Sequence, residues 1–168
     1  MKRLVLMLCV MVIFLSSCSI NKKDNKCDVI VNFTAQANII TENDNILCSL
    51  SRATNNVSCI NIYEPQQLKG LKFVCSDDKY SIEYNDLVYE TNDLCLPDTA
   101  FSRAIMNVLD SIESKENLEQ TDMYDKVSVL KGKCDSGDFE IFVNTDTKFI
   151  EKMVIDSINL SVIFSEQH

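Results

Sequence analysis

The sequence predicts a mainly β protein of the α+β class, in which a strongly curved antiparallel half-barrel sheet of about ten strands wraps around a central amphipathic helix. Apolar and polar residues alternate at every second position through most of the chain, and short segments rich in Asn and Asp interrupt the alternation. One segment in the middle of the chain has helical periodicity instead. Because a flat sheet of that width would leave one face bare, we expect the sheet to bend around the helix.

The first half of the chain contains the more regular strands. They are expected at residues 28–41, 45–53, 57–63, 71–76, 80–84 and 87–90. The connections between them are short, so strands that are neighbours in sequence should pair in space. This half of the sheet is therefore predicted to be an antiparallel meander.

The helix is expected after Leu96-Pro97, where Asp98 is a suitable N-cap residue. Apolar residues recur at helical spacing over about 16 residues, and they are Phe101, Ile105, Val108, Leu109 and Ile112. This stripe needs an apolar partner, and the sheet is the only one that the pattern offers. After the helix, strands are expected again at residues 126–134, 138–144, 149–155 and 158–165.

The N-terminal residues have the organisation of a secretory signal peptide. Lys2 and Arg3 precede an uninterrupted apolar run from Leu4 to Leu15. At 1.5 Å per residue this run reaches about 18 Å, which is too short for a permanent membrane-spanning helix. We therefore expect the segment to be removed.

The apolar run ends in Leu15-Ser16-Ser17-Cys18, which resembles the lipobox of bacterial lipoproteins. The resemblance implies that a diacylglycerol is attached to the Cys18 thiol and that Cys18 becomes the first residue after cleavage. Two acyl chains anchor a protein almost irreversibly. The alternatives are an ordinary secreted protein cut near Ser17 and an uncleaved anchor. The expected organisation is a lipoprotein signal peptide at 1–17, a lipidated tether at 18–26 and a single domain at 27–168.

Composition excludes several classes of function. The chain has 16 Lys and Arg against 25 Asp and Glu, a net charge of −9, which disfavours nucleic acid or an anionic membrane face as a binding partner. The single histidine is the terminal His168, and neither G-x-S-x-G nor H-E-x-x-H occurs. We therefore expect a protein that is not an enzyme and holds no cofactor or metal.

The eight cysteines have different expected roles. Cys9 leaves with the signal peptide and Cys18 carries the lipid. The remaining six allow up to three disulfides in an exported protein, and they are Cys27, Cys48, Cys59, Cys75, Cys95 and Cys134. If Tyr63 faces Leu71 across the 64–70 connection, Cys59 faces Cys75 within reach of a disulfide. The alternative is that all six are reduced core residues.

A resemblance to a family rests on the order of several segments rather than on one motif. The stretch INIYEPQQLKGLKF at 60–73 is similar to a strand, Pro, "LKGL", strand segment of the LolA-like lipoprotein-carrier superfamily, in particular its lipid-anchored members from Gram-positive, Firmicutes-type bacteria. The segments YSIEYNDLVYE, LPDTAFSRAIMNVLDSI, SGDFEIFVNTDTKFIEKMVI and NLSVIFSE follow in the same order. The resemblance implies a half-open barrel whose concave side, in carriers, holds acyl chains of a lipid or lipoprotein.

The function expected from these observations is that of an extracytoplasmic lipoprotein, anchored to the cell membrane, that binds a lipid or another hydrophobic ligand in the concave face. The candidate ligand-lining residues are Phe33, Ala35, Ala37, Ile39, Leu71, Phe73, Phe101 and Ile105. Small side chains at Ala35 and Ala37 would widen a cavity. The alternative is that these residues pack against the helix and leave no space.

A second hypothesis is an interaction or sensor domain without a ligand cavity, which presents an edge strand or an acidic face to an envelope protein. It is motivated by the net charge and by an acidic cluster, which consists of Glu113, Glu116, Glu119, Asp122 and Asp125. The alternative for this cluster is a solvated loop.

Overall fold

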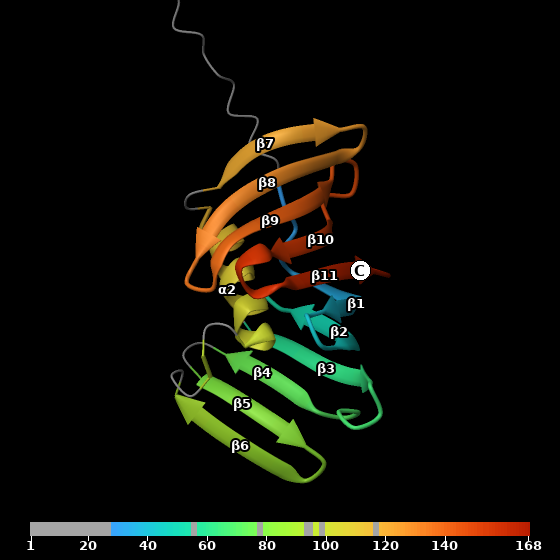
Figure 1. Ribbon diagram of the computed structural model, residues 1–168, viewed down its shortest axis with the longest axis vertical. Helices are drawn as coiled ribbons and strands as arrows, with labels where there is room; N and C mark the ends of the chain where they lie inside the picture. The colour runs from blue at the N-terminus through green and yellow to red at the C-terminus, as the bar shows by residue number, and fades with distance from the viewer. Residues whose placement is uncertain (1–27, 55–56, 77–78, 93–95, 98–99, 116–117) are drawn as a thin grey trace, which may run out of the picture.

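The computed structural model describes residues 28–54, 57–76, 79–92, 96–97, 100–115 and 118–168. In these residues it contains one antiparallel sheet of eleven strands that curves around a single α-helix (Figure 1). The strands are β1 (Phe33–Ile40), β2 (Asn45–Arg52), β3 (Ser58–Glu64), β4 (Lys72–Ser76), β5 (Lys79–Tyr84), β6 (Leu87–Asn92), β7 (Glu119–Tyr124), β8 (Val127–Cys134), β9 (Gly137–Asn144), β10 (Ile150–Ile155) and β11 (Leu160–Ser165). The helix is α2 (Phe101–Ser114), and a short 3₁₀ turn, η1 (Asp156–Ile158), precedes β11. The predicted fold class is confirmed.

The strand order is β6-β5-β4-β3-β2-β1-β11-β10-β9-β8-β7. The first half of the chain is thus a meander, as predicted. The second half is a meander as well, and the two meet where β11 pairs with β1. The C-terminal residue extends this pairing, since the N–H groups of Thr34 and His168 each donate to the other residue's carbonyl at 3.1 and 3.0 Å. The edges of the sheet are therefore two strands from the middle of the chain, β6 and β7.

The helix α2 has 14 residues, and Ala100 is at its N-cap position. Asp98, the predicted cap, lies outside the described residues. The helix ends at Lys115, which has a left-handed conformation with φ of 54° and donates its N–H to the Ile112 carbonyl. The apolar stripe predicted from the sequence is confirmed, because four of its residues are buried and Phe101 is partly buried.

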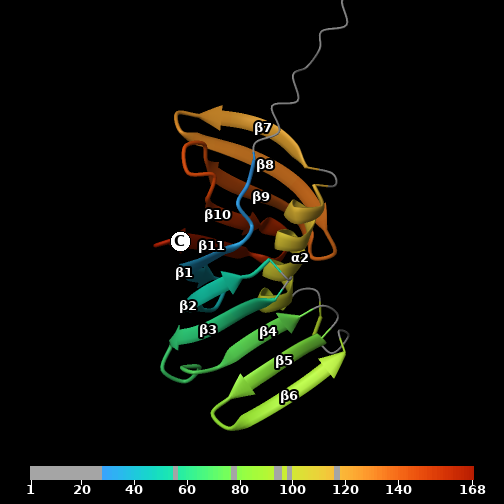
Figure 2. The ribbon, with the colours of Figure 1, turned by 180° about the vertical axis from the view of Figure 1, so that it is seen from behind.

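The helix lies across the middle of the sheet and is attached to it at three places (Figure 2). Near its start, the ring of Phe101 contacts Phe73 of β4 edge to face, with centroids 5.4 Å apart. Near its end, Asp110 and Glu113 bind Arg52 of β2. On its other side, Asn107 Nδ2 donates to Ser136 Oγ in the β8–β9 turn at 3.0 Å. These contacts join both meanders to one helix.

The Arg52 side chain is only 2% exposed, although both of its carboxylate partners reach solvent. Its Nη1 lies 2.7 Å from Asp110 Oδ1, and its Nη2 contacts Glu113 Oε2. Burial by itself lowers the pKa of Arg52, but the hydrogen bonds to Glu113 and Asp110 outweigh this effect and raise the pKa. A buried guanidinium is stable only while such partners remain, because an unpaired buried charge costs several kcal/mol.

One strand was not predicted from the sequence. Residues Glu119–Tyr124 form β7, whereas the acidic pattern of this segment favoured a solvated loop. As an edge strand, β7 pairs only with β8, and its register shifts between Gln120 and Asp122. A strand with one neighbour and little buried surface does not need the apolar alternation that identifies the other strands.

The predicted pairing across the 64–70 connection is wrong by one residue. The structure pairs Ile60 with Phe73 and Asn61 with Lys72, which puts Ile62 rather than Tyr63 opposite Leu71. The cause is a bulge: the Gly70 N–H donates to the Ile62 carbonyl while the Ile62 N–H donates to the Leu71 carbonyl, both at 2.9 Å. Gly70 has φ of +86°, the conformation that such a bulge requires.

We expect the loss of Arg52 and the loss of its two carboxylate partners to change the free energy of unfolding by different amounts. The double variant Asp110→Ala/Glu113→Ala leaves a buried charge without partners, so the free energy of unfolding should fall by about 3 kcal/mol. Arg52→Met removes the buried charge and should cost clearly less, since both carboxylates can be hydrated. Urea unfolding of the domain lacking residues 1–18 measures both changes. A larger loss for Arg52→Met than for the double variant would contradict this account.

Candidate binding surface on the concave face of the sheet

The concave face beneath α2 is filled by side chains. Five of the eight predicted ligand-lining residues are at most 3% exposed and belong to one hydrophobic core, namely Phe33, Ala35, Ala37, Ile39 and Ile105. Space for an acyl chain would appear as accessible surface on these side chains. The small residues Ala35 and Ala37 instead lie in a close-packed core, in which Val108 and Leu109 of the helix are fully buried. These five residues are therefore part of the packed core that the sheet and the helix share.

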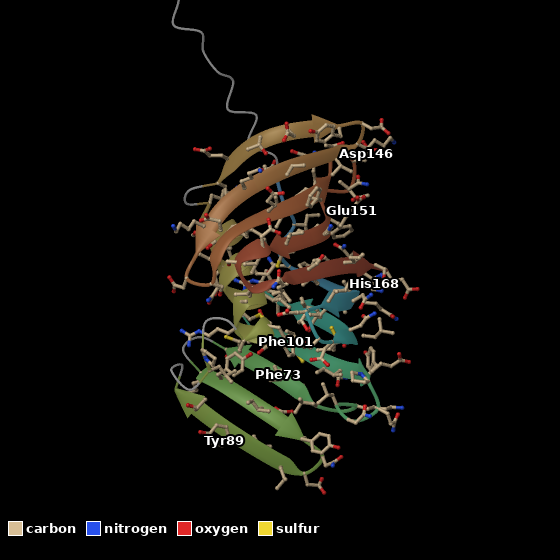
Figure 3. The ribbon with its side chains drawn as sticks, viewed as in Figure 1. Phe73, Tyr89, Phe101, Asp146, Glu151 and His168 are labelled. Carbon is tan, nitrogen blue, oxygen red and sulfur yellow. The ribbon has the colours of Figure 1, made fainter. Side chains whose placement is uncertain are left out.

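The other three predicted lining residues lie at the border of the covered area. Phe73 is 8% exposed, and Leu71 and Phe101 are partly buried. Figure 3 shows Phe101 of α2 beside Phe73 of β4, with Tyr89 farther along the sheet on β6. On its other side Phe73 contacts Tyr80 of β5, with ring centroids 6.4 Å apart. Tyr80 is itself only 6% exposed, so the buried part of the concave face ends at this residue of β5.

Beyond this border the concave face remains apolar but is open to solvent. The strand registers place Ile60, Phe73, Ile82 and Tyr89 in one row across β3, β4, β5 and β6. The exposed fraction rises along this row, from 0% at Ile60 to 57% at Tyr89. We call this surface the apolar wing, and it consists of Leu71, Ile82, Tyr84, Leu87 and Tyr89.

Leu87 is the most exposed residue of the apolar wing, at 74%. It lies opposite Tyr84, which is also exposed. Sequence reasoning placed a strand here but did not recognise a site. A usable signal was the length of the helix: 14 residues span about 21 Å, whereas eleven strands span about 50 Å, so part of an apolar concave face had to remain uncovered.

The predicted disulfide between Cys59 and Cys75 is not formed. Cys59 lies opposite Val74, and Cys75 lies opposite Ser58 and Tyr80, so the two thiols lie on opposite faces of the sheet. Cys48, Cys59 and Cys134 are free thiols. The one-residue shift at Gly70 is the physical reason, because a shift of one residue exchanges the faces of a strand. Cys18, Cys27 and Cys95 lie outside the described residues.

Burial controls the chemistry of the thiols. It raises the pKa of Cys48 to about 12, and this thiol contacts the Ala37 carbonyl at 3.6 Å. Burial is also the largest cause of a raised pKa at Cys59 and at Cys134. A thiol whose pKa is raised carries little thiolate at neutral pH, so none of these three is an activated nucleophile.

A shallow depression of about 550 Å³ lies over β8, β9 and η1, away from the apolar wing. Its charged side chains pair with one another across the strands, Lys131 with Glu140 at 2.5 Å and Lys133 with Asp138 at 3.7 Å. Both lysines of this surface are therefore paired with carboxylates, and Glu119 and Asp156 add further negative charge to its lining. Two of the predicted acidic cluster, Glu119 and Asp122, lie on β7 beside it, and Glu113 instead binds Arg52.

In the part of the chain that the structure describes, no three His, Cys, Asp or Glu side chains gather in a way that could hold a metal ion. Within the same residues, α-helices of sufficient length and apolarity to cross a membrane are also lacking.

Solved structures resemble this fold, although no protein-family model and no curated protein matches the sequence. An uncharacterized conserved protein from Thermus thermophilus is similar with a TM-score of 0.52 and 10% identity, over 81% of this chain and 77% of that one. A LolA superfamily protein from Nitrosomonas europaea has a TM-score of 0.43 and 9% identity, over 84% and 87%. One chain in the structure of the CwlD amidase from Clostridioides difficile in complex with the GerS lipoprotein has a TM-score of 0.45 and 20% identity, over 82% of each chain.

At these identities the first similarity shows a shared fold and nothing further. The curved open antiparallel sheet with one helix is the half-barrel that the sequence predicts.

The different environments of the cysteines predict their order of alkylation. In the folded domain at pH 8, iodoacetamide should modify Cys59 well before Cys48, because the Cys48 thiol is buried and has a pKa of about 12. In urea the two should react alike. Mass spectrometry of peptides at timed intervals measures the rates. If Cys59 and Cys75 became reactive only after a reductant was added, they would form a disulfide and the register described above would be wrong.

Proposed function

We propose that this protein is a non-enzymatic binding module of the cell envelope, anchored through Cys18, that docks an apolar surface of a partner protein on the apolar wing. The observation that carries the proposal is the exposure of Leu87, Tyr89 and Tyr84 on the face that is otherwise the core of the molecule. Contiguous apolar surface of this kind, left bare beside a filled core, is typical of interaction sites.

The form of the surface favours a protein over an enclosed lipid. An acyl chain gains about 0.8 kcal/mol for each buried CH₂ group, but only where the group is removed from water on all sides. The residues that would enclose an acyl chain, among them Ala35 and Ala37, are buried in the same core as α2 and leave no accessible surface for it. A protein partner can shield an open face from water with its own surface, and aromatic residues such as Tyr84 and Tyr89 are common at the centre of such interfaces.

A lipid ligand is the second candidate, and one observation favours it. Leu71, Phe73 and Phe101 form an apolar border between the helix and the wing, so an acyl chain lying on Ile82 could also contact the side of α2. This candidate corresponds to the hydrophobic-ligand function expected from the sequence. Lipid extraction of the purified protein, followed by mass spectrometry, separates the candidates: a stoichiometric lipid supports the second and contradicts the first.

The anchor gives a direct prediction. Cys18→Ser removes the thiol that would accept the diacylglycerol, so the protein should leave the membrane fraction and lose the mass of the lipid. Cys27→Ser is the matched control and should remain in the membrane. Fractionation followed by intact-mass measurement tests this. Retention of the Cys18→Ser variant in the membrane would contradict lipid anchoring at this residue.

The apolar wing is tested by photo-crosslinking in cells. With p-benzoylphenylalanine in place of Tyr84, the full-length protein should form an adduct of discrete mass with an envelope protein that mass spectrometry identifies. Leu87→Asp/Tyr89→Asp should reduce the adduct at least tenfold, since each apolar side chain contributes about 1.5–3 kcal/mol when buried.

The matched control is Ile163→Asp, which changes an exposed apolar residue on the opposite face of β11. This variant should leave the adduct unchanged. Equal adduct from the double variant and the control would contradict the proposed site, and an adduct of lipid mass would favour the second candidate.

A further inference from the structure

The strand β6 ends the sheet with an open edge. It pairs with β5 along its whole length, and no described strand lies on its other side. The two strands are joined by a two-residue turn, Asn85-Asp86, in which Asn85 has φ of 53°. Residues that flank such a turn form a hydrogen-bonded pair, and the pairs alternate along an antiparallel ladder. By this alternation, Leu87 and Tyr89 direct their backbone groups toward β5, while those of Val88 and Glu90 point away from the sheet.

The two edges of the sheet differ in how they resist further pairing. The β7 edge carries Glu119 and Asp122 and a register shift between Gln120 and Asp122, which are features that discourage the addition of a strand. The β6 edge has a continuous register with β5, carries one acidic residue, Glu90, and contains neither Lys nor Pro. Its first three residues, Leu87, Val88 and Tyr89, are all exposed and apolar. An edge with these properties accepts another strand readily.

We infer that an extended segment of the partner protein pairs with β6 as a further strand of the sheet. This inference rests on the proposed function and specifies how the partner binds. The backbone of the segment would satisfy the outward N–H and C=O groups of Val88 and Glu90. Alternate side chains of the segment would fall beside Leu87 and Tyr89 and extend the apolar wing. The segment therefore carries apolar residues at every second position on that face.

The charged residues near β6 indicate which molecule supplies this segment. Glu90 on β6 and Asp86 in the adjoining turn are exposed and form no ion pair with any described residue, while Lys79 lies at the far end of the β5–β6 ladder, opposite Asn92. A second copy of this chain paired through β6 would bring its own Glu90 to the same edge, and like charges across a ladder are destabilising. With a net charge of −9 the chain also repels anionic lipid. The segment thus belongs to another protein and has Lys or Arg near Glu90.

The test separates the edge from the face of β6. Using the full-length protein with p-benzoylphenylalanine at position 84, Val88→Pro removes an outward N–H without touching the ladder with β5, because edge strands tolerate proline on their free side. The partner adduct should fall at least tenfold. Val88→Thr, which keeps the N–H, should leave it unchanged. Glu90→Lys should lower it about threefold, in line with the strength of a single cross-strand charge pair.

The outcomes are distinguishable. If Val88→Pro keeps the adduct while Leu87→Asp/Tyr89→Asp loses it, the partner docks on the wing without adding a strand, and this inference fails while the proposed function stands. If neither variant changes the adduct, both fail. Sequencing of the cross-linked peptide gives an independent check: a peptide from this chain, or one lacking alternate apolar residues and a nearby Lys or Arg, overturns the inference. Resistance of the Val88→Pro protein to trypsin confirms that it folds.

Discussion

The architecture depends on a mismatch between one short helix and a wide sheet. The 14 residues of α2 reach about 21 Å, whereas the eleven strands present an apolar concave face of about 50 Å. Curvature of the sheet brings β2, β4 and the β8–β9 turn into contact with the same helix (Figure 2), and the concave face of the central strands is buried. Curvature cannot bring β6 under the helix as well. The uncovered wing is thus a direct consequence of how much surface one helix can cover.

The way in which the helix is held makes its position specific. Hydrophobic packing alone would allow α2 to slide along the apolar groove, because such contacts have no preferred direction. Three directional contacts oppose this: the ring pair of Phe101 and Phe73, the amide of Asn107 on Ser136, and the two carboxylates on Arg52. A buried guanidinium contributes little net stability, but it strongly disfavours any arrangement that separates it from its partners. The border of the apolar wing is defined by this fixed position.

The same packing determines which surface is available for binding. The sequence suggested that small side chains at Ala35 and Ala37 would leave room for a ligand. In the structure both residues are buried in a close-packed core, in which larger side chains of facing elements occupy the space beside small ones. Apolar surface remains available only where the helix ends. An open face next to an unprotected strand edge offers both side-chain and backbone contacts to a partner, and the acidic residues beside it limit which partners fit.

Local pattern in the sequence determined most of the secondary structure. Alternation identified ten of the strands, and helical spacing identified the buried stripe of Phe101, Ile105 and Val108, because both patterns reflect which side of each element meets the core. The motif at Cys18 predicts an anchor in the same local way. Only the tertiary structure decided three things: that β7 forms an edge strand, that the bulge at Gly70 puts Cys59 and Cys75 on opposite faces, and that Leu87 and Tyr89 stay uncovered. Each depends on what lies next to a residue in space, and an alternating pattern specifies the face of a strand but not what covers that face.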